Sequence, residues 1–224
     1  PGCVGAMAPN VVLRGNRRLD GDLAAIATHR PPIVITSVGS PRGVVPALHD
    51  AGVAVLADVG SERHADRAVD DGVDGLVLLT AGAGGQTGWA NPFAFVRSVR
   101  RRWPMMPIVL AGGIGDGVAL RAAVTLGCDL AYMGTRFLAT VESTASAAHK
   151  QLVVDATFDD VRIATSPMGL PANFLDASIP RVTADAPAEA WSSAGHVVSV
   201  ISDIPTVGQL LAQTELEFRE RGFC

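Results

Sequence analysis

The sequence predicts an α/β fold, a (βα)8 TIM barrel that lacks its first βα units. Two observations lead to this prediction. From about residue 30, short apolar segments alternate with helical segments, and glycine-rich turns follow three successive strands. Strands that are apolar throughout are typical of parallel sheets covered by helices, and turns at consecutive strand ends meet at one mouth of a barrel. An open dinucleotide-binding sheet would carry G-x-G-x-x-G followed by an acidic residue, and no such turn occurs.

Six strands and the helices between them can be located from the apolar pattern. The strands are expected within residues 10–14, 31–40, 53–61, 73–82, 106–117 and 128–138. The helices are expected at 19–28, 43–52, 62–72, 91–103 and 118–127, several ending in a glycine that is typical of a helix stop. A barrel of this type has eight strands. Because the chain also begins at Pro1 rather than at Met, we expect two βα units to be missing from its N-terminus.

After the last expected barrel strand the pattern changes. We therefore expect a partial barrel over residues 1–142 and a lid or insertion over 143–200, which contains a stretch rich in Pro, Gly and Asn. Residues 201–224 are expected to form a C-terminal helix that packs back on the barrel. The apolar residues expected to face inward from this helix are Leu210, Leu211 and Leu216.

Composition excludes several classes of partner. The 224 residues carry a net charge of −4 and one tyrosine, which argues against a nucleic-acid partner. No apolar run approaches the roughly 18 residues of a membrane span, so no membrane partner is expected. Three widely separated cysteines form neither a disulfide framework nor a metal site. These features predict a cytoplasmic protein without a metal.

Two glycine-rich turns predict a phosphate site. The segments "LAGGIGDG" (110–117) and "YMGTRF" (132–137) follow consecutive expected strands. In (βα)8 barrels the last two such turns commonly hold a phosphate with backbone N–H groups. The alternative interpretation is a pair of tight turns between packed elements. The residues expected to hold the phosphate are Gly112, Gly113, Gly134 and Thr135, with Arg136 adding positive charge.

The chain resembles the nitronate monooxygenase family, once called 2-nitropropane dioxygenases, which includes flavin-dependent enoyl-acyl-carrier-protein reductases. The segments that carry the resemblance, in order, are "GVDGLVLLTAGAGGQTG", "PIVLAGGIGDGVAL", "GCDLAYMGTRFLATVES", "GLPANFL" and "WSSAGHVVSVISDIP". The resemblance implies an FMN-bound TIM barrel that oxidises alkyl nitronates to carbonyl compounds and nitrite with O₂. A small-molecule substrate and O₂ are thus the expected partners. The oligomeric state, a homodimer among the options, stays open.

The resemblance also assigns roles to individual residues. The pairs Gly112–Gly113 and Gly134–Thr135 match the family's phosphate-binding "GG" and "MGT". A third match is to the "AGG" whose backbone passes the isoalloxazine ring, and it consists of Ala83, Gly84 and Gly85. The family's next residue is a histidine described as the catalytic base, and this chain has Gln86 there. Gln86 is therefore the candidate catalytic residue.

The change from histidine to glutamine has a chemical consequence. Histidine accepts a proton near neutral pH, whereas the amide of Gln86 only donates and accepts hydrogen bonds. We expect Gln86 to hold a substrate oxygen and the protein to use nitronates rather than neutral nitroalkanes. Other candidate residues leave alternatives open: Asp58 as an ionisable group or a helix cap, Ser37 as a hydrogen-bond partner of the flavin, and His196 and His149 as site or structural residues.

Two other functions remain open from the sequence. One is a reductase that passes electrons from NAD(P)H through the flavin to a quinone or an enoyl thioester. The other is a catalytically impaired FMN-binding paralogue or fragment, which the two missing βα units and the absent histidine favour.

Overall fold

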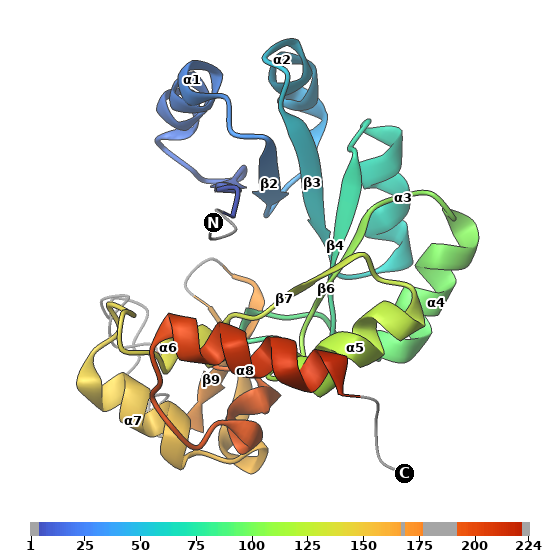
Figure 1. Ribbon diagram of the computed structural model, residues 1–224. Coiled ribbons are helices and arrows are strands. Elements are labelled where there is room, and N and C mark those ends of the chain that lie inside the picture. The colour runs from blue at the N-terminus through green and yellow to red at the C-terminus, as the bar shows by residue number, and fades with distance from the viewer. Residues whose placement is uncertain (1–4, 167–168, 177–191, 221–224) are drawn as a thin grey trace.

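A parallel sheet of six strands forms the centre of the molecule (Figure 1). The computed structural model describes residues 5–166, 169–176 and 192–220. The strand order is β1-β2-β3-β4-β6-β7, every neighbouring pair is parallel, and no pairing joins β1 to β7 in these residues. The strands are β1 (Asn10–Val12), β2 (Ile33–Ser37), β3 (Ala54–Val59), β4 (Gly75–Leu79), β6 (Ile108–Ala111) and β7 (Leu130–Tyr132). The described sheet is thus open, as expected of an incomplete barrel.

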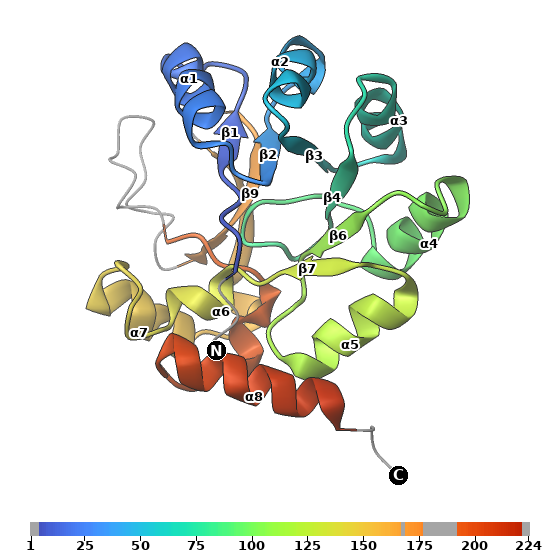
Figure 2. The same ribbon diagram turned by 45° about the horizontal axis from the view of Figure 1, so that its top comes forward.

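Five helices lie in an arc outside these strands (Figure 2). They are α1 (Leu19–His29), α2 (Val45–Asp50), α3 (Glu62–Asp70), α4 (Pro92–Arg102) and α5 (Gly117–Leu126). Three of them begin at a side chain that accepts a hydrogen bond from a backbone N–H of the first turn. These N-caps are Ser61, Asn91 and Asp116. Such caps stabilise a helix by about 1 kcal/mol each and fix where it starts.

The strands bury side chains on both faces, as the apolar pattern predicts. The outer face packs against the helices in a core that includes Val34, Val55, Ala57, Val59, Leu76, Leu78, Ile108 and Leu110. The inner face forms a smaller cluster of Ile35, Leu56, Val77, Leu79, Val109 and Ala111. Because side chains alternate along a strand, Asp58 shares the inner face with Leu56. The inner face is the side on which the cavity lies.

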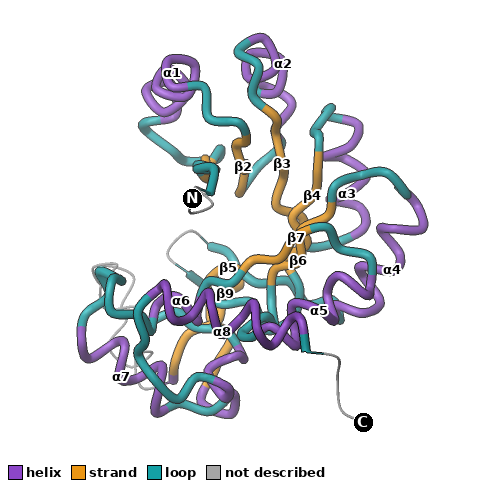
Figure 3. The backbone as a smooth tube through the Cα atoms, viewed as in Figure 1, coloured by secondary structure: helices purple, strands orange, loops and turns teal. Residues whose placement is uncertain are grey.

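A second sheet, which the sequence did not predict, holds the glycine-rich segment after β4. Its strands are antiparallel and run in the order β5 (Gly85–Gln86), β9 (Pro171–Leu175) and β8 (Val161–Thr165). Figure 3 labels β5 and β9. The remaining elements in this region are α6 (Thr135–Leu138), α7 (Ala147–Asp155), η2 (Phe158–Asp160) and η5 (His196–Val200). Residues 177–191 of the predicted lid lie outside the described residues.

The C-terminal helix α8 (Val207–Arg219) packs against α5, but not through the residues expected to face inward. Leu210 is buried, whereas Leu211 and Leu216 are each 54% exposed. The buried partner of Leu210 is Thr214, whose hydroxyl donates to the Leu210 carbonyl. A Cβ atom on Gly117 would lie 2.2 Å from the Thr214 carbonyl oxygen, so the two helices approach too closely for a larger residue. Backbone proximity rather than a leucine stripe sets this contact.

Candidate functional site

A cavity of about 310 Å³ lies at the carboxyl ends of the parallel strands. Its wall consists of the loops after β4, β6 and β7, the segment 195–197, and inner-face side chains of β1 to β3. Seven of the eight residues predicted for the site line it: Ala83, Gly84, Gln86, Gly112, Gly113, Gly134 and Thr135. Gly85 does not line the cavity and pairs with Asn173 in the small sheet.

The glycine-rich loops interlock, and two positions require glycine for this. Gly112 has a φ of 116°, and a Cβ there would lie 2.6 Å from the Thr80 hydroxyl oxygen. A Cβ on Gly84 would lie 2.7 Å from both Thr135 Oγ1 and the backbone nitrogen of Gly195. Side chains of any size would push the loops apart. The glycines thus bring three loops into mutual backbone contact around the cavity.

Backbone donors line one side of the cavity. In the part of the chain that the structure describes, the N–H groups of Gly112, Gly113 and Gly134 donate no hydrogen bond to the protein. A Cβ on Gly113 or Gly134 would meet no atom within 4 Å, so both residues border open space. Clustered unpaired N–H groups in turns bind anions such as phosphate. We call Gly112, Gly113, Gly134 and Thr135 the glycine cradle, and its donors fit a phosphate group.

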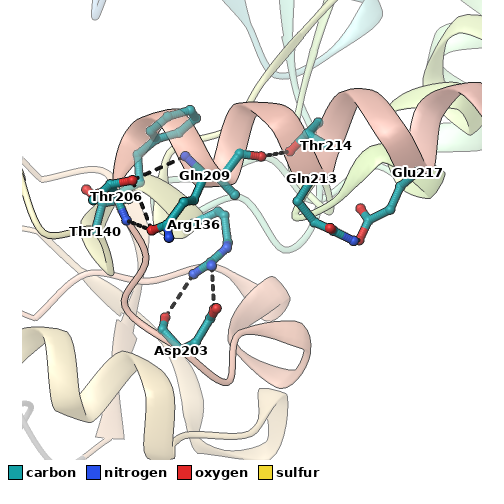
Figure 4. Close-up of polar contacts among 10 residues, drawn as sticks. Arg136, Thr140, Asp203, Thr206, Gln209, Gln213, Thr214 and Glu217 are labelled. Carbon is teal, nitrogen blue, oxygen red and sulfur yellow. Dashed lines mark hydrogen bonds and ion pairs between the residues drawn. The ribbon is translucent and has the colours of Figure 1, made fainter.

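Arg136 does not contribute its charge to the cradle, contrary to the prediction. Its side chain is 8% exposed, and its guanidinium donates to Asp203 Oδ1 at 2.6 Å and to the Asp203 carbonyl at 3.1 Å (Figure 4). The residue is absent from the cavity lining. Thr135 is also partly engaged, since its hydroxyl oxygen accepts the Gly195 N–H at 2.9 Å. The cradle therefore relies on backbone donors and on the Thr135 hydroxyl proton.

Gln86 is half-buried at the cavity and is positioned by the small sheet, in which it pairs with Ala172. Neither histidine considered from the sequence lines the cavity. The His196 ring packs against Gly82, where a Cβ would lie 2.8 Å from its Nδ1. His149 is half-buried on α7, where burial lowers its pKa. Among the described residues that line the cavity, no histidine takes the place of the family histidine that Gln86 replaces.

A row of polar side chains from three neighbouring strands lines the same cavity as the cradle. Ser37 donates to Asn10 Oδ1 at 2.8 Å, and the Asn10 side chain is hydrogen-bonded to Asp58. We call Asn10, Ser37 and Asp58 the inner polar row. Sequence reasoning singled out Ser37 and Asp58 but missed Asn10. The available signal was a polar residue at the start of the short strand "NVVLR".

Asp58 is an acidic residue of the cavity lining with a raised pKa. Burial raises the pKa of its carboxyl to about 7, against a smaller lowering effect of the hydrogen bond from Asn10. Its Oδ1 is buried and receives no hydrogen bond from the residues described. Across the cavity, burial raises the pKa of the Tyr132 phenol to about 12, and the charge of Asp58 acts in the same direction. Asp58 is therefore the group in this lining whose charge changes near neutral pH.

Comparisons with known proteins identify relatives of the chain. A family model described as nitronate monooxygenase matches residues 5–190. The nitronate monooxygenase of Pseudomonas aeruginosa is 34% identical over 139 residues, which cover 58% of this chain and 39% of that protein. The (3aS,4S,5R,7aS)-5-hydroxy-7a-methyl-1-oxo-octahydro-1H-indene-4-carboxyl-CoA dehydrogenase of Mycobacterium tuberculosis is 31% identical over 134 residues, which cover 59% of this chain and 38% of that protein. The chain therefore spans about two fifths of the length of these curated relatives.

Solved structures agree with the fold. FabK from Thermotoga maritima superposes with a TM-score of 0.82 at 26% identity, covering 94% of this chain and 75% of that one. A nitroalkane oxidase from Streptomyces ansochromogenes gives 0.76 at 26% identity, covering 89% and 67%. These likenesses confirm the predicted barrel class.

None of the described helices is long and apolar enough to cross a membrane. Nor do the described residues include three His, Cys, Asp or Glu side chains grouped to hold a metal ion.

Proposed function

The chain belongs to the nitronate monooxygenase family, and on that premise we propose that it is an FMN-dependent oxidoreductase that oxidises alkyl nitronates to carbonyl compounds and nitrite with O₂. The observation that carries the proposal is the glycine cradle, whose unpaired N–H groups face a cavity bordered by the segment of Ala83 and Gly84. FMN, when bound, supplies the electron acceptor and the reactivity towards O₂. The protein supplies position and electrostatics.

The cradle would hold the FMN phosphate through the N–H groups of Gly112, Gly113 and Gly134 and through the hydroxyl of Thr135. Since the Arg136 guanidinium forms an ion pair with Asp203, backbone N–H dipoles rather than a cation would stabilise the phosphate charge. The backbone of Ala83 and Gly84 would border the ring. Gln86 then orients the substrate with an amide that donates two N–H bonds and accepts at its oxygen.

Nitronates suit these residues because the α-proton of the parent nitroalkane is already absent. An anionic nitro group accepts hydrogen bonds from the Gln86 amide, and no proton has to be removed before oxidation. The same residues are compatible with a reductase that takes electrons from NAD(P)H. Turnover with each electron donor distinguishes the two reactions.

A visible absorption spectrum of the purified protein, with identification of the released cofactor, tests the flavin first. We expect oxidised-flavin bands and released FMN. Ethylnitronate should then bleach the flavin without O₂ and give acetaldehyde and nitrite when O₂ is admitted. Bleaching by NADPH in the absence of any response to ethylnitronate would favour the reductase. A colourless protein that does not take up added FMN would contradict the proposal.

Gly134→Glu gives a matched test of the cradle. Gly134 has an ordinary φ of −93° and no neighbour within 4 Å of an added Cβ, so the backbone should tolerate the change while a carboxylate enters the cavity. We expect FMN affinity to fall at least about 100-fold, since the new carboxylate would lie beside the phosphate and like charges repel. Gly208→Glu is the control, because a Cβ on Gly208 also meets nothing within 4 Å and the residue lies on α8, away from the cavity.

A further inference from the structure

Asp58 combines three features that the proposed function does not use. It lies on the inner face of the sheet, lines the same cavity as Gln86, and has a buried Oδ1 without a hydrogen-bond partner among the described residues. Its neighbour strands contribute Asn10 and Ser37, which are neutral. A carboxyl group at the wall of a cavity can exchange a proton with a bound molecule.

The arrangement of the inner polar row fixes which way Asn10 points. Ser37 has a hydroxyl proton to give, and it donates to Asn10 Oδ1. The amide nitrogen of Asn10 is therefore the atom left to donate to Asp58. The carboxyl of Asp58 thus has Asn10 as its neutral neighbour and keeps a buried Oδ1 without a hydrogen-bond partner among the described residues.

We propose that Asp58 is the proton acceptor of this site and takes over the task that Gln86 cannot perform. The inference rests on the proposed function and extends its substrate class from nitronates to neutral nitroalkanes. In the step, the ionised carboxylate of Asp58 takes the α-proton of the nitroalkane. The C–H bond breaks, an O–H bond forms on the carboxyl, and the electron pair moves onto the nitro group. One negative charge is present before and after, now on the nitronate, and no oxidant takes part.

The pKa of Asp58, raised by burial to about 7, suits this step. A general base is most effective when its pKa lies near the working pH, because it is then both available and strong enough. A carboxylate with an ordinary pKa near 4 would be a weak base for a C–H group. Burial of Asp58 thus gives a carboxyl the basicity that histidine normally supplies.

The surroundings of Asp58 offer few competing charges. Tyr132 on β7 is the other titratable side chain among the described residues that line the cavity, and its raised pKa keeps it neutral near pH 7. Strands β2 and β4, on either side of β3, carry no ionisable residue. Helices α2 and α3 pack on the other face of the sheet. Their ionisable residues are His49, Asp50, Glu62, Arg63, His64, Asp66, Arg67 and Asp70.

The experiment compares freshly diluted nitroethane with ethylnitronate in the wild-type protein and in Asp58→Asn. In the wild type, kcat/KM for nitroethane should rise about tenfold per pH unit up to about pH 7 and then level off, with a primary isotope effect for α-deuterated nitroethane. In Asp58→Asn, the ratio of kcat/KM for nitroethane to that for ethylnitronate should fall about 10²- to 10⁴-fold. Asp50→Asn, an exposed substitution on α2, is the matched control and should leave this ratio at the wild-type value.

A second readout does not depend on turnover. Infrared difference spectra between pH 5 and pH 9 should show a protonated carboxyl band that titrates near pH 7 and is missing in Asp58→Asn. Absence of that band, or an unchanged substrate ratio in Asp58→Asn while ethylnitronate is still oxidised, would overturn the inference alone. Failure of the wild type to oxidise ethylnitronate would instead overturn the proposed function, and the inference with it.

Discussion

The glycine cradle and the inner polar row face the same cavity but are built from different chemistry. The cradle uses backbone N–H groups and depends on residues that lack side chains. The row uses three side chains, Asn10, Ser37 and Asp58, that the sheet brings together from three strands. A backbone site concentrates glycine in short segments and so leaves a motif in the sequence. A side-chain site leaves single residues far apart, and only strand register joins them.

The largest effect is expected from a substitution that disrupts the cradle. In Gly112→Ala the new Cβ would meet the Thr80 hydroxyl at 2.6 Å in a backbone conformation that favours glycine. We expect the free energy of unfolding to fall by about 1–3 kcal/mol and FMN affinity to fall at least about tenfold. Urea unfolding and FMN titration measure the two effects. Gly208→Ala on α8 should leave affinity unchanged, and wild-type affinity in Gly112→Ala would mean that the loop contact is dispensable.

The next prediction concerns the inner polar row and the pH dependence of the protein's stability. The folded-state pKa of Asp58, about 7, lies above its ordinary value near 4, so between these pH values the folded protein binds more protons than the unfolded chain. Stability is therefore lost as the pH rises from about 4 to about 7. Asp58→Asn removes this loss, so its melting temperature should equal that of the wild type near pH 4 and exceed it by several degrees at pH 8. A constant difference across this range would contradict the raised pKa.

A smaller effect is expected from Gln86→His, which introduces a second proton acceptor into the cavity that the row lines. Histidine titrates near 6.5, so nitroethane turnover should increase several-fold between pH 6 and 7 relative to ethylnitronate. Steady-state rates over this range measure the change. Gln86→Asn, which keeps the amide but not the basicity, should give no such gain. An equal gain in both variants would point to altered packing.

The smallest effect is expected from Ser37→Ala, which leaves Asp58 in place but removes the donor to Asn10 Oδ1. The Asn10 amide is then less firmly oriented towards Asp58, and one hydrogen bond of this kind contributes about 1 kcal/mol. The pKa of Asp58 should therefore rise by less than about one unit. An infrared pH titration measures the shift, and a fall in the pKa would show that Ser37 orders the amide in another way.

The sequence predicted the parallel strands, the helices and the cradle because each leaves a local signal. The strand cores are continuous apolar runs, and the cradle glycines lie next to one another in the chain. Arg136 was misassigned because its position beside the "MGT" turn says nothing of Asp203, its partner from a distant segment. The α8 leucines were misassigned because Gly117 lets the two helices meet at Thr214. Strand β5 is two residues long and is defined only by its pairing with β9.

One contact described above bears on the order in which the protein folds. The Gly195 N–H donates to Thr135, and the His196 N–H donates to the Gly82 carbonyl. Residues 195 and 196 therefore close the loops after β4 and β7, which precede them by many residues in the sequence. Contacts between residues so far apart in sequence form late, because the intervening chain must first lose its conformational entropy. On the ribosome, the earlier loops are therefore synthesised well before the segment that locks them together. The wall of the cavity is therefore complete only after residues 195 and 196 have been synthesised and have paired with the earlier loops.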